Sequence, residues 1–570
     1  MRRGQTIALL CALVSLIASD LVFGRQREGR PSDQAPHGIT FASVADAAGI
    51  SFRHTNGASP AKHLVETMGS GGLFLDFDGD GRLDILLVDG GSVADKRVAA
   101  GARHRLYLNR GDATFVDVTA RAGLAHRGYG MGACAADYDN DGRVDFFITG
   151  PGPNALYRNN GDGTVSDVTR PAGLAVAGLT TSCTFADIDN DGDLDLFVVG
   201  YVDVEANQLA CGNGRIRAYC RPDVYTGIPD FLYSNNGDGT FTDVSRRAGI
   251  DRSGGKGLGV VAGDYDDDGR VDFFVANDLT PNFLYHNEGN GTFRETALLA
   301  GVAVASDGRI RAGMGTDFGD YNGDGRLDLV VTNFELETHN VFKNLGGGLF
   351  ADATYETGLG VATIPFLGFG AVFLDVDNDG DLDLAIANGH VLDNTSIFQS
   401  ASTYEQRNLL LVNNGAGRFR DVGATAGPGF AIRKVSRGLA AGDIDNDGDL
   451  DLLVTNNGQT ADLLRNESGS GQNAVLVQLV GRTSNRGGIG ARVRATIAGR
   501  TLVREAKAAS SYLGQSDARL HFGLGASPRV DRLEIRWPSG QMDITSAIPS
   551  AQIVTITEGL GITARTSFDR

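Results

Sequence analysis

The chain has 570 residues and a formal net charge of −19 at pH 7. It contains no strongly basic stretch, which argues against nucleic acid as a partner. Glycine is abundant, with 80 residues, whereas proline is not enriched, and this composition is typical of many tight turns rather than of a disordered chain.

The N-terminus has the pattern of a secretory signal. Met1-Arg-Arg is followed by a short apolar run from Ile7 to Ile17. Cleavage fits after Ser19 or after Gly24, so we predict a signal peptide over residues 1–24 and a linker over 25–38. An uncleaved anchor is disfavoured because Asp20 interrupts the short run, and we expect no stable membrane insertion after cleavage. The mature protein is predicted to be secreted or extracytoplasmic: periplasmic, extracellular or on the cell surface.

Seven acidic loops dominate the sequence. Each follows the pattern D-x-[DN]-x-D-G-x-[LV]-D, with glycine at position six, where the backbone must turn tightly. Oxygen donors at positions one, three, five and nine, with the backbone carbonyl of position seven, suit Ca²⁺. The candidate ligands are Asp76, Asp78, Asp80, Arg82 and Asp84; Asp137, Asp139, Asp141, Arg143 and Asp145; Asp187, Asp189, Asp191, Asp193 and Asp195; Asp264, Asp266, Asp268, Arg270 and Asp272; Asp320, Asn322, Asp324, Arg326 and Asp328; Asp375, Asp377, Asp379, Asp381 and Asp383; and Asp443, Asp445, Asp447, Asp449 and Asp451.

These loops are not EF-hands. Position twelve is apolar rather than a bidentate glutamate, and the segments after each loop, such as 85–88, resemble strands rather than helices. A metal-free turn held by aspartate side chains is the alternative for any single loop. Seven loops with three or more aspartates each would repel strongly without a cation. We therefore predict up to seven Ca²⁺ ions, with the loop containing Asn322 as the weakest site.

A second motif alternates with the acidic loops and completes a four-stranded repeat. It reads L-Y-x-N, a tight turn, then F-x-D-V, as in segment 106–118, and the acidic loops start 50 to 77 residues apart. Four short strands at such a period predict propeller blades. The seventh repeat lacks its fourth strand, and segment 39–44 matches the missing one. The prediction is an all-β chain with a seven-bladed β-propeller over residues 39–467, closed by the N-terminal strand.

Four cysteines lie beyond the apolar N-terminal run. Cys211 and Cys220 fall in one irregular insertion and are expected to form a disulfide in an oxidising compartment. Cys134 and Cys183 precede successive acidic loops by three and four residues, so their side chains are expected on opposite strand faces. We predict that these two remain buried thiols.

Recognition is expected on the face opposite the acidic loops. The connections between the second and third strands vary greatly in length, whereas the acidic loops keep one length, and variable loops on a fixed scaffold commonly carry binding sites. The alternative is that asparagines at strand ends simply cap turns. The candidate contact residues are Asn277, Asp278, Asn333, Glu335, Asn388 and His390.

Both repeat motifs resemble the FG-GAP repeats of integrin-like propellers, in which such loops bind calcium. Segments 479–492, His521-Phe-Gly-Leu-Gly and Trp537-Pro-Ser-Gly resemble the ASPIC/UnbV domain. The combination is similar to the cartilage acidic protein family and its bacterial relatives. This resemblance implies a secreted, calcium-binding protein of adhesion or interaction type, without catalytic residues to carry over.

Residues 473–559 are predicted to form a small antiparallel β-sandwich, followed by a tail over 560–570. Several segments alternate or run apolar as strands do, with glycine-rich turns between them. Arg486, Arg492, His521 and Trp537 could indicate a site, but a buried tryptophan and a structural histidine explain them more simply.

The sequence favours a non-catalytic binding or adhesion module whose partner is an extracellular protein or glycan. The main alternative is a carbohydrate-active enzyme, a polysaccharide lyase or hydrolase, for which His339 and His390 are the best candidates. The histidines show no metal-type spacing, and no hydrolase motif is present. A third possibility is an accessory factor in the biosynthesis of a secreted metabolite.

Overall fold

The computed structural model describes residues 38–91, 104–124, 128–204, 210–398, 400–469 and 471–569, which belong to one compact unit. The predicted signal peptide, and the predicted linker up to residue 37, lie outside the described residues. Within these ranges no helix is long and apolar enough to cross a membrane.

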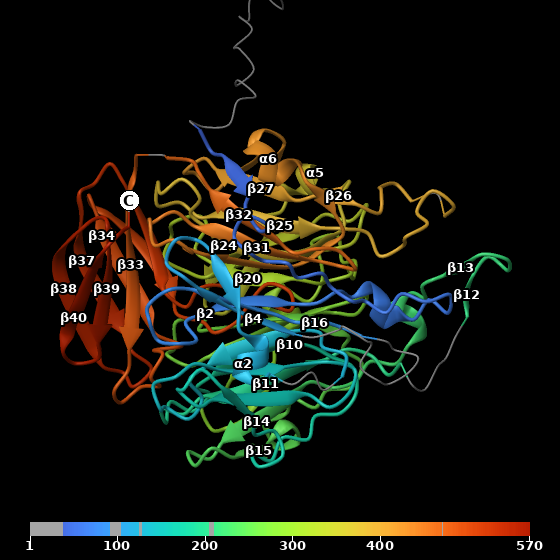
Figure 1. Ribbon diagram of the computed structural model, residues 1–570, viewed down its shortest axis with the longest axis horizontal. Coiled ribbons are helices and arrows are strands. Elements are labelled where there is room, and N and C mark those ends of the chain that lie inside the picture. The colour runs from blue at the N-terminus through green and yellow to red at the C-terminus, as the bar shows by residue number, and fades with distance from the viewer. Residues whose placement is uncertain are drawn as a thin grey trace, which may run out of the picture. The chain divides into compact units, whose positions relative to one another are not determined.

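Seven four-stranded antiparallel sheets form the larger part of the molecule (Figure 1). In blade order they are β2 (Gly72–Leu75), β3 (Asp84–Leu87), β4 (Arg105–Asn109) and β5 (Phe115–Asp117); β6 (Ala133–Ala136), β7 (Asp145–Ile148), β8 (Ala155–Asn159) and β9 (Val165–Asp167); β10 (Thr180–Ala186), β11 (Asp195–Gly200), β14 (Phe231–Asn235) and β15 (Phe241–Asp243); β16 (Gly257–Gly263), β17 (Asp272–Asn277), β18 (Phe283–Asn287) and β19 (Phe293–Glu295); β20 (Thr316–Gly319), β21 (Asp328–Val331), β22 (Asn340–Gly346) and β23 (Leu349–Asp352); β24 (Gly368–Leu374), β25 (Asp383–Asn388), β27 (Leu409–Asn413) and β28 (Phe419–Asp421); and β30 (Ser436–Gly442), β31 (Asp451–Asn456), β32 (Asp462–Asn466) and β1 (Phe41–Ser43).

Short elements lie in the connections within, between and before the blades. They are the helical turns η1 (Leu64–Thr67), α2 (Thr119–Ala122), η2 (Pro222–Val224), α3 (Ser245–Ala248), α4 (Ala297–Ala300), α5 (Leu359–Thr363), η3 (Gly423–Thr425) and α6 (Gly427–Ala431), and the two-residue strand pairs β12 (Cys211–Gly212) with β13 (Arg217–Ala218) and β26 (Gln406–Arg407) with β29 (Arg433–Lys434). The first two strands of every blade are buried along their whole length, because neighbouring blades cover both faces. This explains their continuous apolar runs.

The first and last blades meet, which closes the ring. The innermost strand of each blade contacts that of the next, and β30 of the seventh blade contacts β2 of the first. Strand β1 pairs with β32 in the register Phe41 to Asn466, so the N-terminal strand completes the last blade. The predicted all-β fold class is confirmed, and β1 pairs with the strand that the sequence predicts.

The asparagine of the L-Y-x-N motif ties each blade to the preceding one. Its side-chain amide donates to the backbone carbonyl at position two of the preceding acidic loop over 2.7–2.9 Å in all seven blades. In the first blade the acceptor is Ile444 of the seventh, so this chain of bonds also runs around the ring. The seven residues are Asn109, Asn159, Asn235, Asn287, Asn344, Asn413 and Asn466.

The C-terminal domain is a sandwich of two four-stranded sheets around a core that includes Trp537. One sheet has the order β36 (Leu520–Gly525), β33 (Asn473–Val480), β39 (Gln552–Thr557) and β40 (Gly561–Ser567); the other has β35 (Arg500–Glu505), β34 (Arg492–Ile497), β37 (Arg529–Arg536) and β38 (Met542–Pro549).

Two predictions for this domain are corrected. Strands β33 and β39 are parallel, so the sandwich is mixed rather than purely antiparallel. The chain crosses to the other sheet for β37 and β38 before it returns, and such a crossover permits parallel pairing. The predicted tail contains β40, which pairs with β39. This edge strand is mostly exposed and polar, so it lacks the apolar alternation that marks a strand in sequence.

A segment of the C-terminal domain fills the centre of the propeller. Residues 507–517, here called the channel segment, follow β35 and contact the innermost strands of the blades. Leu513 accepts the N–H of Ala133 and donates to Ser182, Ser511 pairs with Thr316, and Gln515 pairs with Leu73. Next to β2, a Cβ added to Gly71 would stand 1.7 Å from the Leu513 carbonyl oxygen, so glycine is required there.

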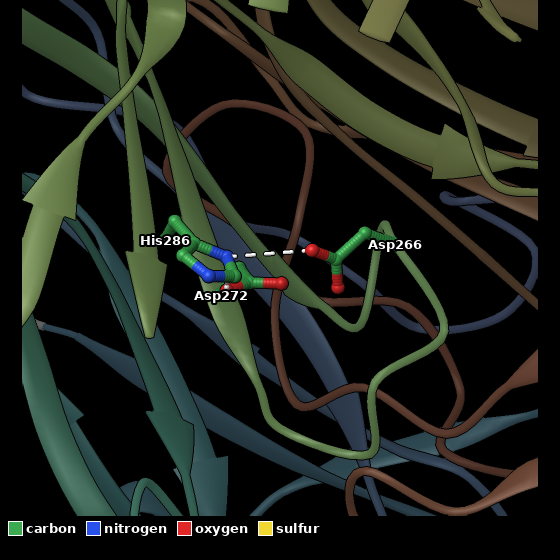
Figure 2. A group of neighbouring side chains, drawn as sticks. All are labelled: Asp266, Asp272 and His286. Carbon is green, nitrogen blue, oxygen red and sulfur yellow. Dashed lines mark ion pairs between the residues drawn. The ribbon is translucent and has the colours of Figure 1, made fainter. Parts of the chain in front are cut away.

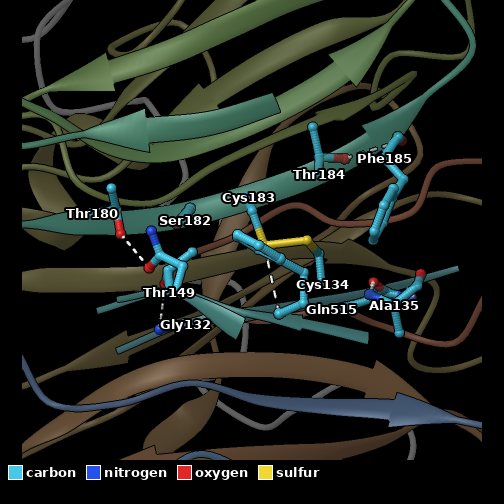
Figure 3. The surroundings of a disulfide bond; sticks show 12 residues. Gly132, Cys134, Ala135, Thr149, Thr180, Ser182, Cys183, Thr184, Phe185 and Gln515 are labelled. Carbon is cyan, nitrogen blue, oxygen red and sulfur yellow. Dashed lines mark hydrogen bonds between the residues drawn. A yellow bond between two sulfur atoms is a disulfide. The ribbon is translucent and has the colours of Figure 1, made fainter. Parts of the chain in front are cut away.

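Two disulfides are present. Cys211 and Cys220 join within the long connection of the third blade. Cys134 on β6 and Cys183 on β10 also join, with Cα atoms 5.7 Å apart (Figure 3). The prediction of two buried thiols is therefore wrong. Both cysteines lie on innermost strands of adjacent blades, and these blades pack face to face, so side chains on opposite strand faces meet between them.

Candidate functional site

The seven acidic loops share one hydrogen-bonded frame. In each loop the glycine at position six has φ between 82° and 95° and donates its N–H to the position-one carboxylate over 2.8–3.0 Å. The position-nine carboxylate accepts the N–H of the L-Y-x-N asparagine over 2.7–2.9 Å. Backbone contacts thus hold the position-one and position-nine carboxylates of every loop in place.

These contacts leave carboxylate oxygens free to bind a cation. One oxygen each from Asp76, Asp78 and Asp84 lie within 4.8 Å of one another, and the second and third blades repeat this arrangement. Five buried loop carboxylate oxygens have no hydrogen-bond partner: Asp139 Oδ1, Asp145 Oδ2, Asp266 Oδ1, Asp272 Oδ2 and Asp377 Oδ1. Buried anions without partners are costly, so this donor set fits a hard divalent cation.

The electrostatics of the loops also favour cation binding. Burial, reinforced by the charges of neighbouring aspartates, raises the pKa of Asp84 and of Asp145 to about 8. A bound dication would favour their ionised forms. The fifth loop differs, because the amide of Asn322 donates to Asp328 over 2.8 Å and thereby occupies one ligand oxygen.

Cationic side chains of the C-terminal domain cover the acidic loops of blades four, six and seven. The domain therefore docks on the loop face through opposite charge, and its contacts lie directly beside the candidate cation sites. The ion pairs are Arg536 with Asp264, Arg492 with Asp267 and Arg500 with Asp381, and Arg519 adds a hydrogen bond to the amide oxygen of Asn446.

A cavity of about 440 Å³ lies among the connections between second and third strands, and is here called the connection cavity. Its walls come from residues 219–222 of blade three, 334–337 of blade five and 390–392 of blade six, with Leu64 and Met68 from the segment before blade one. Tyr512 and Leu513 of the channel segment belong to the same apolar cluster as its lining residues. The C-terminal domain thus supports this cavity from within the ring.

Several polar groups line this mostly apolar cavity. Tyr201 donates to Asp278 over 2.8 Å, and burial raises the pKa of Asp278 to about 7. Ser400 and Ser402 each donate to Glu335 over 2.6 Å. Burial opposes ionisation of Glu335, but these hydroxyl hydrogen bonds outweigh it and lower its pKa.

His390 lies beside Glu335. Its Nε2 is 3.3 Å from Glu335 Oε1, and burial lowers its pKa. Its Nδ1 accepts the N–H of Leu392 over 2.9 Å, which assigns the proton of the neutral ring to Nε2. In this tautomer Nε2 cannot accept the hydroxyl proton of Ser400, 3.4 Å away.

The structure divides the six candidate recognition residues into two groups. Asp278, Glu335 and His390 line the connection cavity. The asparagines do not: the side-chain amide of Asn277 donates to Pro281, that of Asn333 to Thr338 and that of Asn388 to Arg407. Each of these side chains satisfies a backbone group of its own connection, and their role in recognition stays a prediction. His339 is likewise buried, with Nδ1 accepting the N–H of Asn333, and is not among the cavity residues.

Two sets of residues that shape the cavity and the ring are not identified by the sequence analysis. The cavity aromatics Tyr201, Tyr219, Phe334 and Phe369 carry no local motif that distinguishes them from core residues. The inter-blade asparagine, by contrast, recurs in all seven repeats, and that recurrence was a signal for its role.

Seven repeated blades with acidic loops, joined to a small β-sandwich, define a β-propeller with acidic loops between its first and second strands. The FG-GAP-like repeat model matches residues 76–148, 137–198, 220–275, 264–331, 320–386 and 396–454, which together make up more than half of the chain. The chain belongs to this FG-GAP-like repeat family. The ASPIC and UnbV model matches residues 481–562, within the sandwich.

Curated relatives agree with this assignment. The chain is 28% identical over 371 residues to mouse cartilage acidic protein 1, covering 61% of this chain and 53% of the relative. The human protein of that name is 27% identical over 373 residues, covering 61% of this chain and 52% of the relative. The chain thus spans about half the length of the curated relatives it matches.

Solved structures show weaker similarity. A lectin from Agrocybe aegerita, described as recognising non-reducing terminal N-acetylglucosamine, is 20% identical with a TM-score of 0.36, covering 62% of this chain and 80% of its own. The BP39L lectin from Burkholderia pseudomallei is 8% identical with a TM-score of 0.40, covering 70% and 95%. At these scores the similarity carries no functional argument.

Proposed function

We propose that this chain is a secreted, calcium-binding module that recognises an extracellular protein or glycan through the connection cavity, without catalysing a reaction. The observation that carries this proposal is the convergence of irregular connections from several blades on one cavity of about 440 Å³. A largely apolar cavity of this size with a few fixed polar groups is typical of ligand sites.

Calcium is proposed as a structural ligand of the loops. The unpartnered oxygens and the shared backbone frame are supporting observations. A cation that binds only the folded loops stabilises the fold by mass action.

Secretion is supported by the two disulfides, which persist in oxidising compartments. One of them includes Cys220, which lies in the cavity wall, so oxidising conditions that preserve this disulfide would also hold that part of the wall in place.

The geometry around His390 favours binding over catalysis. The histidine, Glu335 and two serine hydroxyls satisfy one another, and the ring tautomer does not activate Ser400 as a nucleophile. A polysaccharide lyase or hydrolase activity remains the competing proposal, and an activity screen on uronic-acid polymers with His390→Ala tests it.

Array binding tests the proposed function. The exported full chain is applied to a glycan array and to an array of immobilised extracellular proteins, in millimolar calcium and in excess chelator. Saturable binding is expected in calcium, and Ala401→Trp should abolish it because the exposed Ala401 lines the cavity. The matched control Leu298→Trp places the same side chain on α4, where Leu298 is 74% exposed. Equal binding by Ala401→Trp and the control would refute the cavity as the site.

A further inference from the structure

Blade four carries a nitrogen donor where the other blades do not. His286 occupies the third position of the L-Y-x-N motif on β18, beside the acidic loop that begins at Asp264. None of its counterparts is a histidine, cysteine or carboxylate, so none of them offers a usual metal ligand. These counterparts are Leu108, Arg158, Ser234, Lys343, Val412 and Arg465.

Figure 2 shows His286 facing Asp266 and Asp272 of this loop. Its Nδ1 is 3.5 Å from Asp266 Oδ2 and 3.4 Å from Asp272 Oδ1, and one ligand atom of each residue lies within 4.8 Å of the others. These separations exceed those of ordinary hydrogen bonds. Two donors at ~2.1 Å from one tetrahedral ion are ~3.4 Å apart, which matches the observed spacing.

His286 Nδ1 and one oxygen of each carboxylate lack hydrogen-bond partners, whereas Asp272 Oδ1 also accepts the N–H of Asn287. His286 Nδ1, Asp266 Oδ1 and Asp272 Oδ2 are buried without a hydrogen bond, and the side chain of Asp272 is 0% exposed. In blades one, three, six and seven the same oxygen of the position-nine aspartate accepts the N–H of the position-two residue. In blade four that oxygen is free to bind a ligand.

The C-terminal domain removes one ordinary calcium donor from this loop. The guanidinium of Arg536 pairs with Asp264, the position-one carboxylate, and Arg492 pairs with the neighbouring Asp267. The oxygen shell of blade four is thus partly engaged by cations of the protein itself, while Asp266 and Asp272 remain directed toward His286.

We propose that blade four binds a first-row transition-metal dication, with Zn²⁺ as the fitting ion, through His286 Nδ1, Asp266 and Asp272. Imidazole nitrogen suits zinc and its neighbours, whereas calcium takes oxygen donors. Three protein ligands leave one tetrahedral position for water or an outside donor. The inference deepens the proposed function, because it rests on the acidic loops being cation sites. The competing interpretation is a protonated His286 paired with both carboxylates, without a metal.

Metal analysis under competition tests the site. Full-length protein is stripped with chelator, dialysed against zinc with calcium in large excess, and its bound metals are counted by mass spectrometry. One zinc per chain is expected in the wild type and none in His286→Gln, with unchanged calcium content. Ser234→Gln, at the same strand position in blade three, is the matched control and should retain the zinc.

Cobalt substitution tests the site in the wild-type protein, so this measurement needs no variant. In the cobalt-loaded wild type, a hyperfine-shifted exchangeable Nε2–H proton is expected from a histidine bound through Nδ1. Loss of zinc from the wild type under calcium excess, equal zinc in His286→Gln, or a cobalt spectrum without this proton would overturn the inference. A chain that binds zinc at His286 but no calcium elsewhere would instead refute the calcium part of the proposed function.

Discussion

Tyr512 joins the C-terminal domain to the interior of the propeller. Its side chain is fully buried, its ring packs on Phe369 with centroids 5.0 Å apart, and its hydroxyl donates to the Met68 carbonyl over 3.0 Å. Truncating a buried aromatic side chain to alanine costs about 3–5 kcal/mol. Tyr512→Phe removes only the hydroxyl and leaves one carbonyl unpaired, which costs about 1–3 kcal/mol.

Calorimetry of the calcium-loaded full chain measures this effect. With an unfolding entropy of about 2.1 cal/mol/K per residue, a cooperative unit of about 530 residues should lose about 3–5 °C in Tm for Tyr512→Ala and less for Tyr512→Phe. Met542→Ala, at a side chain that is 50% exposed on β38, is the control and should lie within about 0.5 kcal/mol of wild type. If Tyr512→Ala melts like this control, the channel segment does not pack inside the ring in solution.

Three further predictions concern the ring and its loops. Excess chelator should lower the Tm by many degrees at pH 8 and by less at pH 5. The folded-state pKa of Asp84, about 8, lies above its unfolded value, so the stability of the metal-free protein falls as pH rises from about 4 to 8, and calcium should remove this slope. Identical melting with and without chelator would refute the metal sites. Deleting residues through 50 should destabilise the protein far more than deleting residues 25–35, because only the former removes β1; equal melting temperatures would contradict the closure. Asn109→Ala should cost about 1–3 kcal/mol in denaturant unfolding, since it leaves the Ile444 carbonyl unpaired, whereas Asn236→Ala in an exposed hairpin should cost little; similar midpoints would show that the inter-blade bond contributes no stability.

The repeat architecture was predictable because each blade is specified locally. The acidic loop, the L-Y-x-N strand and the F-x-D-V strand fix their own turns, and the missing fourth strand of the seventh repeat indicated that segment 39–44 closes the ring. Pairing of β1 with β32 confirms that inference.

Contacts between blades were harder to predict. Cys134 and Cys183 were assigned to opposite strand faces and therefore to separate thiols. In a propeller the opposite faces of neighbouring blades meet, so cysteines on opposite strand faces of adjacent blades can form a disulfide, as these two do. The disulfide depends on how neighbouring repeats pack, and no pattern within a single repeat predicts that packing.

The channel segment and the lining of the connection cavity could not be predicted from the sequence either. Residues 507–517 have neither strand alternation nor a turn motif, so nothing marks them as the filling of a channel. Asp278 and Asn277 are adjacent at the end of one strand, yet one lines the cavity and the other bonds within its own connection. Which side chain faces the cavity depends on the path of the connection after the strand.

The channel segment has a consequence for biosynthesis. It is encoded after all seven blades, and β1 finds its partner β32 more than four hundred residues later in the chain. The first strand made must therefore wait for the last blade, and the ring encloses an unfilled centre until the C-terminal domain emerges. We therefore expect the last steps of folding to follow synthesis. A polypeptide that stops before residue 507 would have every blade and no filling for its channel.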